Sequence, residues 1–177
     1  MFEKVILIDD AGWGDLLLGV VVGALNLNLP DARYMERRIP IASFQPPNFE
    51  NKKYLGDTVT IADEIVEVMH PDAETNFKVC SGYVLSSVRE HLRERGFRVE
   101  RVEATGELQE KVERGYLRWC KEMGAPAEIR EDKERFWTFL EWVAESPRFR
   151  EKLVKTGWES WKMKWRAKAF LRGRRAC

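Results

Sequence analysis

An apolar run interrupted by two carboxylates and two glycines, Val5–Leu25, constrains the fold of this chain more than any other stretch. Val5–Ile8 is too short for a helix of its own and too apolar for a strand with a solvated face, which predicts a strand inside a sheet. Asp9 and Asp10 follow at the predicted strand end. Leu16–Ala24 comes after a glycine turn, and its simplest placement is the antiparallel partner in a hairpin.

The adjacent carboxylates of Asp9 and Asp10 have two interpretations. Like charges at a strand end repel each other unless a cation neutralises them, which favours a hard divalent ion such as Mg²⁺ or Mn²⁺. An Asp-Asp-x-Gly run is also typical of a turn, because Asp side chains accept hydrogen bonds from nearby backbone N–H groups and glycine supplies a positive φ. Spacing alone leaves both interpretations open.

The run I-D-D-A-G-W-G-D-L-L-L-G-V-V-V-G-A-L resembles the first hairpin of type 2 ribonucleases H, whose motif I-D-E-A-G-R-G precedes a short loop and a V-V-V-A-A strand. By this resemblance, Asp9 corresponds to the metal-binding aspartate of that family and Asp10 to the adjacent glutamate. Trp13 departs from the family, because it replaces the arginine of the loop that reads the ribonucleotide junction. The resemblance implies a metal site at Asp9 and Asp10 more strongly than it implies a substrate, although nucleic acid would contact Gly12, Trp13 and Gly14.

Composition indicates a globular protein, expected in the cytoplasm. The chain has 177 residues, of which 44% are hydrophobic and 33% charged, enough for one domain with a helical appendage. No apolar run reaches the roughly 18 residues that a membrane span requires, and the first residues show no export signal. Cys80, Cys120 and Cys177 form no C-x-x-C pair, and the first two are expected as small apolar core residues. His70 and His91 belong to no recognisable catalytic triad.

Charge is unevenly distributed along the chain. Residues 147–177 hold 11 Lys and Arg against 2 Asp and Glu, a net charge of +9. Residues 1–146 hold 19 against 27, a net charge of −8. An acidic body with a basic tail is typical of proteins that address anionic partners.

From residue 33 onward, the pattern alternates strands and helices. The predicted elements are a strand Arg33–Phe44, a loop Gln45–Asn51, a helix from Asp57 or Thr58 to His70, a helix Gly82–Arg95, a strand Phe97–Ala104 and a helix Glu107–Met123. Asn76–Ser81 fits either a strand or the start of the following helix. Three strands followed by helix, strand and helix is the element order of the ribonuclease H-like fold, so an α/β domain with a mixed sheet is expected over residues 1–126.

Further carboxylates are candidates for the same site. In the ribonuclease H-like fold, the second acid follows the fourth strand, next to the first strand, and Glu103 takes that place here, with Glu107 one turn into the next helix. Asp15, just past the glycine turn, is a third candidate ligand. Two-metal phosphodiester hydrolysis needs three or four carboxylates, which makes Asp9, Asp10 and Glu103 the candidate catalytic residues. Each added acid has the alternative of being a solvated charge, and no counterpart exists for the aspartate that type 2 enzymes carry on their last helix.

The basic extension, residues 127–177, is predicted to be helical. Its elements are a helix Arg130–Ala144, a helix beginning at Ser146-Pro147, and a segment Trp158–Leu171 after an interruption at Gly157. Three tryptophans at helical spacing lie among four cations in that segment: Trp158, Trp161, Trp165, Lys162, Lys164, Arg166 and Lys168. Aromatic faces among cations suit nucleic acid, where bases stack and phosphates pair with Lys and Arg. The alternatives are that the tryptophans dock the helix on the core, or that a basic amphipathic helix lies on an anionic membrane.

These patterns lead to one functional hypothesis with two rivals. We expect a divalent-metal-dependent nuclease that hydrolyses phosphodiester bonds in RNA or DNA with Mg²⁺ or Mn²⁺. The first rival is a non-catalytic nucleic-acid- or protein-binding relative of the same fold. The second is a small-molecule enzyme that uses the same acids to hold one metal ion.

Overall fold

The computed structural model describes residues 4–28, 33–103, 106–127 and 132–173. The chain forms two compact units, each assembled from separate stretches of sequence. Unit 1 combines residues 1–11, 21–39 and 54–115, and unit 2 combines residues 12–20, 40–53 and 116–177. The division into a domain 1–126 and an extension 127–177 stays a prediction.

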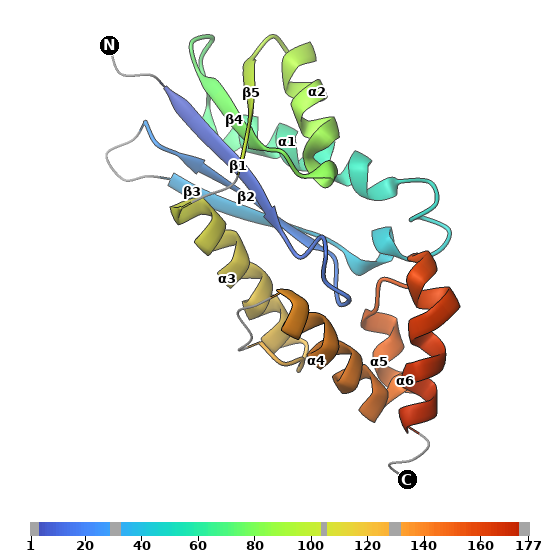
Figure 1. Cartoon of the computed structure of the whole chain (residues 1–177). Coiled ribbons are helices and arrows are strands. Elements are labelled where there is room, and N and C mark those ends of the chain that lie inside the picture. The colour runs from blue at the N-terminus through green and yellow to red at the C-terminus, as the bar shows by residue number, and fades with distance from the viewer. Residues whose placement is uncertain (1–3, 29–32, 104–105, 128–131, 174–177) are drawn as a thin grey trace. The chain divides into compact units, whose positions relative to one another are not determined.

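Unit 1 is built on a five-stranded mixed sheet, which confirms the α/β class (Figure 1). Its strands are β1 (Val5–Ala11), β2 (Val20–Asn26), β3 (Arg33–Ile39), β4 (Asn76–Cys80) and β5 (Arg98–Val102). The order across the sheet is β3-β2-β1-β4-β5. β1 pairs antiparallel with β2 and parallel with β4, and β4 pairs parallel with β5. The predicted hairpin therefore supplies two neighbouring strands of the sheet.

Burial follows the position of each strand. Every residue of β2 is buried, as expected for an apolar strand covered on both faces. β5 lies at the sheet edge and has a charged sequence, R-V-E-R-V, in which no residue is fully buried. Charged side chains on an edge strand discourage pairing with a further strand.

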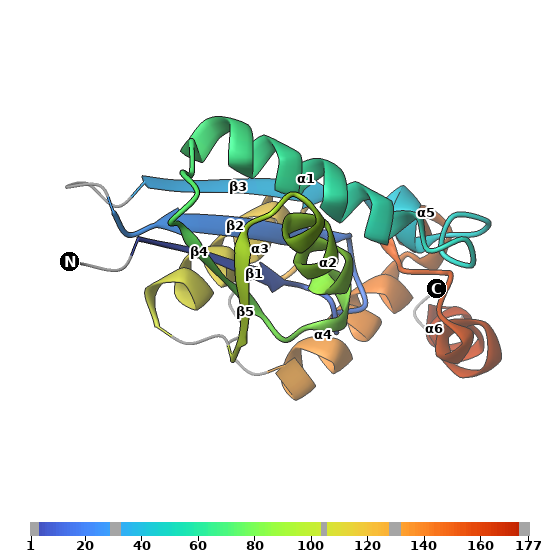
Figure 2. The same cartoon turned by 90° about the horizontal axis from the view of Figure 1, so that it is seen from above.

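Helices cover both faces of this sheet. α1 (Lys53–Met69) and α2 (Ser86–Glu94) lie over one face (Figures 1 and 2). The part of α3 (Glu107–Glu122) that belongs to unit 1 packs on the other face, where a Cβ atom added at Gly23 would lie 2.4 Å from Val112 Cγ1. Gly23 pairs with Asp9 across β1 and β2, so Asp9 belongs to the face that α3 covers.

Three predicted boundaries near the first hairpin are wrong. The third strand stops at Ile39, because Pro40 has no N–H group to continue a ladder, and Ile41–Phe44 forms a 3₁₀ turn, η1. α1 begins at Lys53 rather than at Asp57 or Thr58, since Tyr54 is already buried on its inner side. The second strand begins at Val20 instead of Leu16, because Leu17 forms an isolated bridge with Val154 and the Leu18 N–H donates to the Leu153 carbonyl.

The ambiguous stretch Asn76–Ser81 contains strand β4, and this changes the strand count. β4 lies between β1 and β5, so the strand before Glu103 is the fifth and lies at the sheet edge. The expectation that Glu103 follows a strand adjacent to the first strand is therefore wrong. Cys80 ends the strand that does pair with β1.

Unit 2 is mostly helical. It contains η1, the end of α3, α4 (Asp132–Glu145), α5 (Pro147–Arg150), a 3₁₀ turn η3 (Glu151–Leu153), a π-helical turn η4 (Trp161–Trp165) and α6 (Arg166–Gly173). The predicted helix Trp158–Leu171 is confirmed over most of its length, since residues 159–173 are helical and Trp161–Trp165 form a π turn within them. Arg130, Ala104 and Cys177, named in the sequence predictions, lie outside the described residues. Within the described ranges, every helix is too short or too polar to cross a bilayer.

Candidate functional site

Asp9 lies inside β1 and is almost fully enclosed. The strand continues to Ala11, and Asp9 is the first residue beyond the parallel pairing of β1 with β4, which ends at Ile8 and Val79. The expectation that Asp9 and Asp10 follow the end of the strand is therefore wrong. Side chains alternate along a strand, so these two carboxylates face opposite sides of the sheet. Only 4% of Asp9 is exposed.

One carboxylate oxygen of Asp9 has no hydrogen-bond partner within the part of the chain that the structure describes. Its Oδ1 accepts a hydrogen bond of 2.8 Å from the Asp10 backbone N–H. Its Oδ2 is buried and, among the described residues, receives no donor. Burial raises the pKa of Asp9, and the Asp10 N–H group and the Cys80 thiol lower it to a smaller extent. A buried acceptor without a partner costs about 1 to 3 kcal/mol, so this oxygen is poised to accept a donor or a cation.

Asp9 opens into a cavity of about 220 Å³ on the α3 side of the sheet. The lining residues come from β1, β4, the end of β5 and α3: Leu7, Ile8, Asp9, Lys78, Cys80, Val102, Glu103 and Leu108. Asp9 and Glu103 therefore share one cavity although their strands are not neighbours. Lys78 adds a positively charged side chain to the lining of this cavity, and its Nζ lies 3.9 Å from Glu100 Oε2.

Two other candidate ligands do not line this cavity. The Asp10 carboxylate packs against the turn after β4, where its Oδ1 would lie 2.9 Å from a Cβ atom added at Gly82. Glu107 is exposed on α3, and its Oε1 lies 3.4 Å from Lys111 Nζ. Across the described ranges, no group of three or more His, Cys, Asp and Glu side chains is arranged to hold a metal ion.

Cys80 is a cavity residue that sequence reasoning assigned to the core. It is only half-buried, and burial together with the nearby Asp9 and Asp10 charges raises the pKa of its thiol. Arg89 donates hydrogen bonds to the carbonyls of Cys80 and Gly82, the latter at 3.2 Å, and so fixes the turn that follows β4. The signal that could have identified Cys80 is its place at the end of a strand beside β1, which required recognising β4.

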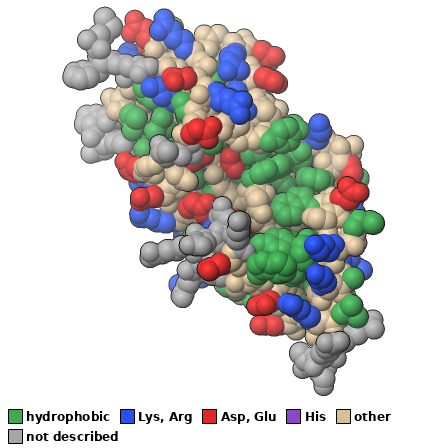
Figure 3. Space-filling model, viewed as in Figure 1, with side chains coloured by type: hydrophobic (Ala, Val, Ile, Leu, Met, Phe, Trp, Pro, Cys, Tyr) green, Lys and Arg blue, Asp and Glu red, His purple; other side chains and the backbone are tan. Residues whose placement is uncertain are grey.

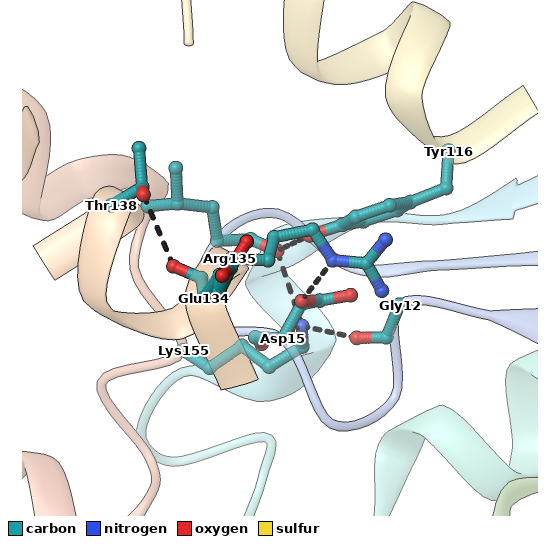
Figure 4. A network of polar contacts seen from close by, with 8 residues as sticks. Gly12, Asp15, Tyr116, Glu134, Arg135, Thr138 and Lys155 are labelled. Carbon is teal, nitrogen blue, oxygen red and sulfur yellow. Dashed lines mark hydrogen bonds and ion pairs between the residues drawn. The ribbon is translucent and has the colours of Figure 1, made fainter. Parts of the chain in front are cut away.

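Asp15 belongs to a buried ion pair in unit 2 (Figure 4). Arg135 Nε donates to Asp15 Oδ1 at 2.7 Å, and both side chains are buried. The pair explains the presence of a buried carboxylate at this position without a metal ion. Arg135, which lies 120 residues away in the sequence, was not identified as its partner beforehand.

A buried lysine holds the loop that contains Asp15. Lys155 is completely buried, and its Nζ donates to the carbonyl oxygens of Gly12 at 2.8 Å, Leu17 at 3.1 Å and Asp15 (Figure 4). Tyr116 Oη donates to the same Leu17 carbonyl at 2.9 Å. Lys155 thus serves as a structural cation within the basic tail.

The predicted nucleic-acid loop is shaped largely by packing. Gly12 has φ +94°, and a Cβ atom there would lie 2.5 Å from the Tyr116 ring, so a glycine is required. Trp13 contacts Phe44 edge to face at 6.1 Å between ring centroids. A Cβ atom at Gly14 would meet nothing within 4 Å. Each residue lies in unit 2.

The three predicted tryptophans differ in their surroundings. Trp161 is 1% exposed and donates from Nε1 to Glu151 at 3.2 Å, so it docks the segment on the core of unit 2. Trp158 is half-buried and stacks with the Lys155 ammonium 5.5 Å from its ring centroid. Trp165 is also half-buried, but its ring contacts Phe136 and a residue that sequence reasoning overlooked, Trp137.

Comparison with known proteins adds no relative from which a function could be transferred. A scan against models of protein families found no match, and a search of curated protein sequences found none either.

Proposed function

We propose that this chain is a ribonuclease H-like, divalent-metal-dependent nuclease that hydrolyses phosphodiester bonds in RNA or DNA. The observation that carries the proposal is Oδ2 of Asp9, which is buried at the wall of the unit 1 cavity and receives no donor from the residues that the structure describes. A lone buried carboxylate is costly unless a proton, a donor or a cation compensates it. The resemblance of the first hairpin to type 2 ribonucleases H and the mixed sheet of unit 1 also support this proposal.

The donor set fits an ion that prefers oxygen ligands. Asp9 would hold the ion, and the Glu103 carboxylate can reach into the same cavity. Oxygen ligands suit Mg²⁺ and Mn²⁺. When bound, such an ion activates water and stabilises charge on the leaving oxygen. Lys78 supplies a positive charge on the cavity wall, which attracts a phosphodiester and offsets part of the repulsion from Asp9 and Glu103.

A second candidate, a non-catalytic nucleic-acid- or protein-binding relative of this fold, is favoured by one specific observation. Cys80, not a carboxylate, ends the strand that pairs with β1. The raised pKa of its thiol keeps it neutral at pH 7, so it does not replace the charge of an acid in the metal-free protein. With fewer carboxylates near Asp9, hydrolysis through two metal ions loses support.

The test compares Asp9→Asn with Asp57→Asn, which makes the same change at a half-exposed position of α1 in the same unit. Metal-free proteins are titrated with Mn²⁺ while electron paramagnetic resonance counts the free ion, and cleavage of labelled RNA, DNA and RNA–DNA hybrids is then measured with Mg²⁺ or Mn²⁺. We expect Asp9→Asn to lose both binding and cleavage, and Asp57→Asn to keep both. Cleavage by Asp9→Asn at the wild-type rate would contradict the proposal. Metal binding at Asp9 without cleavage of any substrate would favour the second candidate.

A further inference from the structure

A second surface with binding chemistry lies in unit 2 and is made of side chains from α4, η4 and α6. We call it the aromatic patch and define it by Phe136, Trp137, Trp165, Lys164 and Lys168. Its three rings contact one another edge to face, with centroid distances of 5.1 to 5.5 Å. Trp137 is 47% exposed, a large apolar area to leave in water. On the face shown in Figure 3, hydrophobic side chains gather over α4 with Lys and Arg side chains beside them.

The cations around the patch divide into two kinds. Lys162 pairs with Glu50 at 2.8 Å and Arg166 with Glu151 at 2.6 Å, so their charges are compensated. Lys164 and Lys168 lie over the Trp165 ring, with Nζ 4.3 and 4.9 Å from its centroid, and are exposed. Among the described residues, neither of these two lysines has an ion-pair partner. Of these four cations, the two whose charge is available to a ligand therefore lie at the aromatic rings.

We infer that the aromatic patch binds single-stranded nucleic acid, with a base stacked on Trp137 and phosphates paired with Lys164 and Lys168. Every base has a π face, so stacking on an exposed indole is tolerant of sequence, and a duplex keeps its bases unavailable for it. Charge favours this occupant, because the exposed ammonium groups of Lys164 and Lys168 lie at the rings, where they suit a polyanion. The inference deepens the proposed function by naming the form of nucleic acid that is bound.

The experiment measures binding in EDTA, so that its failure is distinguishable from a failure of metal-dependent cleavage. The full chain is titrated with labelled oligothymidylate, oligouridylate and a matched DNA duplex. We expect Trp137→Ala to weaken single-strand binding about 5- to 140-fold, the range expected for loss of one stacked base, and to leave duplex binding nearly unchanged. Met163→Ala is the control, because Met163 is exposed on η4, which also carries Lys164 and Trp165, and has no ring. Trp137→Phe should restore most of the affinity, since it restores a stacking face.

The two lysines are tested by salt dependence. Replacing Lys164 and Lys168 together by Gln should make the log-log slope of affinity against salt shallower by about 1.4, at roughly 0.7 for each single-strand phosphate contact. Lys162→Gln removes the same charge from the same segment and should change the slope less, because Lys162 is already paired with Glu50. Equal slopes in all three proteins would overturn the assignment of phosphates to Lys164 and Lys168.

Two further results would overturn the inference as a whole. One is a Trp137→Ala variant that stays folded by circular dichroism and binds the oligonucleotides as tightly as the wild type. The other is binding to vesicles of phosphatidylserine and phosphatidylcholine that depends on Trp137, together with no binding of oligonucleotides. That second result would assign the patch to an anionic membrane surface.

Discussion

Asp15→Asn should destabilise unit 2 strongly, although Asp15 looks from the sequence like a metal ligand. The substitution keeps the shape of the side chain and removes its charge. Arg135 then remains buried with a neutral amide in place of the carboxylate that accepts its hydrogen bond at 2.7 Å. The buried Lys155 ammonium, which donates to the Asp15 carbonyl, adds a second positive charge to the same region.

The expected magnitude follows from the burial of both partners. Removing one partner of a buried ion pair costs about 3 to 5 kcal/mol, because the other charge stays in a medium of low polarity. For a chain of this size, each kcal/mol lowers the melting temperature by roughly 2 to 4 °C, so a drop of about 6 to 20 °C is expected. The double variant Asp15→Asn, Arg135→Met should lose less than the sum of the two single variants, since it removes the uncompensated guanidinium.

Tryptophan fluorescence is the suitable assay, because it reports unit 2 selectively. All seven tryptophans belong to that unit: Trp13, Trp119, Trp137, Trp142, Trp158, Trp161 and Trp165. Urea denaturation of wild type, Asp15→Asn and Asp57→Asn gives the free energy of unfolding of each protein. A loss of less than about 0.5 kcal/mol in Asp15→Asn, the range of ordinary surface substitutions, would refute the reasoning from the buried pair.

Three other predictions concern unit 1 and the glycine loop. Burial raises the pKa of Asp9, so the folded protein keeps the proton of this carboxyl to higher pH than the unfolded chain does. The free energy of unfolding should therefore fall as the pH rises above the pKa of Asp in the unfolded chain, which is near 4. In EDTA, Asp9→Asn should therefore be more stable than wild type at pH 7 and lose that advantage below about pH 4, as measured by urea denaturation with circular dichroism; no difference between the proteins at pH 7 would count against the burial argument. Gly12→Ala should destabilise unit 2 by roughly 1 to 3 kcal/mol because of its positive φ and the contact with Tyr116, whereas Gly14→Ala, measured by the same fluorescence assay, should be nearly neutral. Burial raises the pKa of Cys80, and that of Cys120 to about 11, so in a Cys177→Ser background both thiols should react slowly with a disulfide reagent at pH 8 and rapidly in urea; fast labelling of the native protein would show that they are accessible thiolates.

The sequence was informative where short-range patterns decide structure. The first hairpin could be predicted because Val5–Ile8 and the V-V-V-G-A-L run have no other way to bury so much apolar surface. α2 could be placed because Gly96, with φ +88°, follows its last turn, as a helix C-terminus favours. β4 could not be distinguished from the start of a helix. A stretch of five residues with two buried positions is too short to separate the two-residue period of a strand from the 3.6-residue period of a helix. That ambiguity hid the strand between β1 and β5, so the strand before Glu103 was expected beside β1, and it kept Cys80 out of the predicted site.

The surroundings of the remaining site residues could not be predicted, because they depend on contacts between distant parts of the sequence. Nothing in a local pattern shows that Arg135 will meet Asp15, or that Lys155 will be enclosed by three carbonyl groups from a loop near the N-terminus. Lys155 therefore counted toward the charge of the basic tail, and Lys162 and Arg166 also counted although each pairs with a glutamate. Net charge described the segment correctly, but only the structure separates its structural cations from Lys164 and Lys168.

The most direct test of the proposed metal site is anomalous scattering from crystals soaked in Mn²⁺. Oδ2 of Asp9, which receives no donor among the described residues, is the group that would bind the cation, so we expect an anomalous peak in the unit 1 cavity at a coordination distance of about 2.1 Å from that oxygen. The peak should be absent from crystals of Asp9→Asn soaked in the same way. A cavity that holds no Mn²⁺ in the wild-type crystals, with Asp9 hydrogen-bonded to water or protonated against Cys80, would contradict the metal-dependent function.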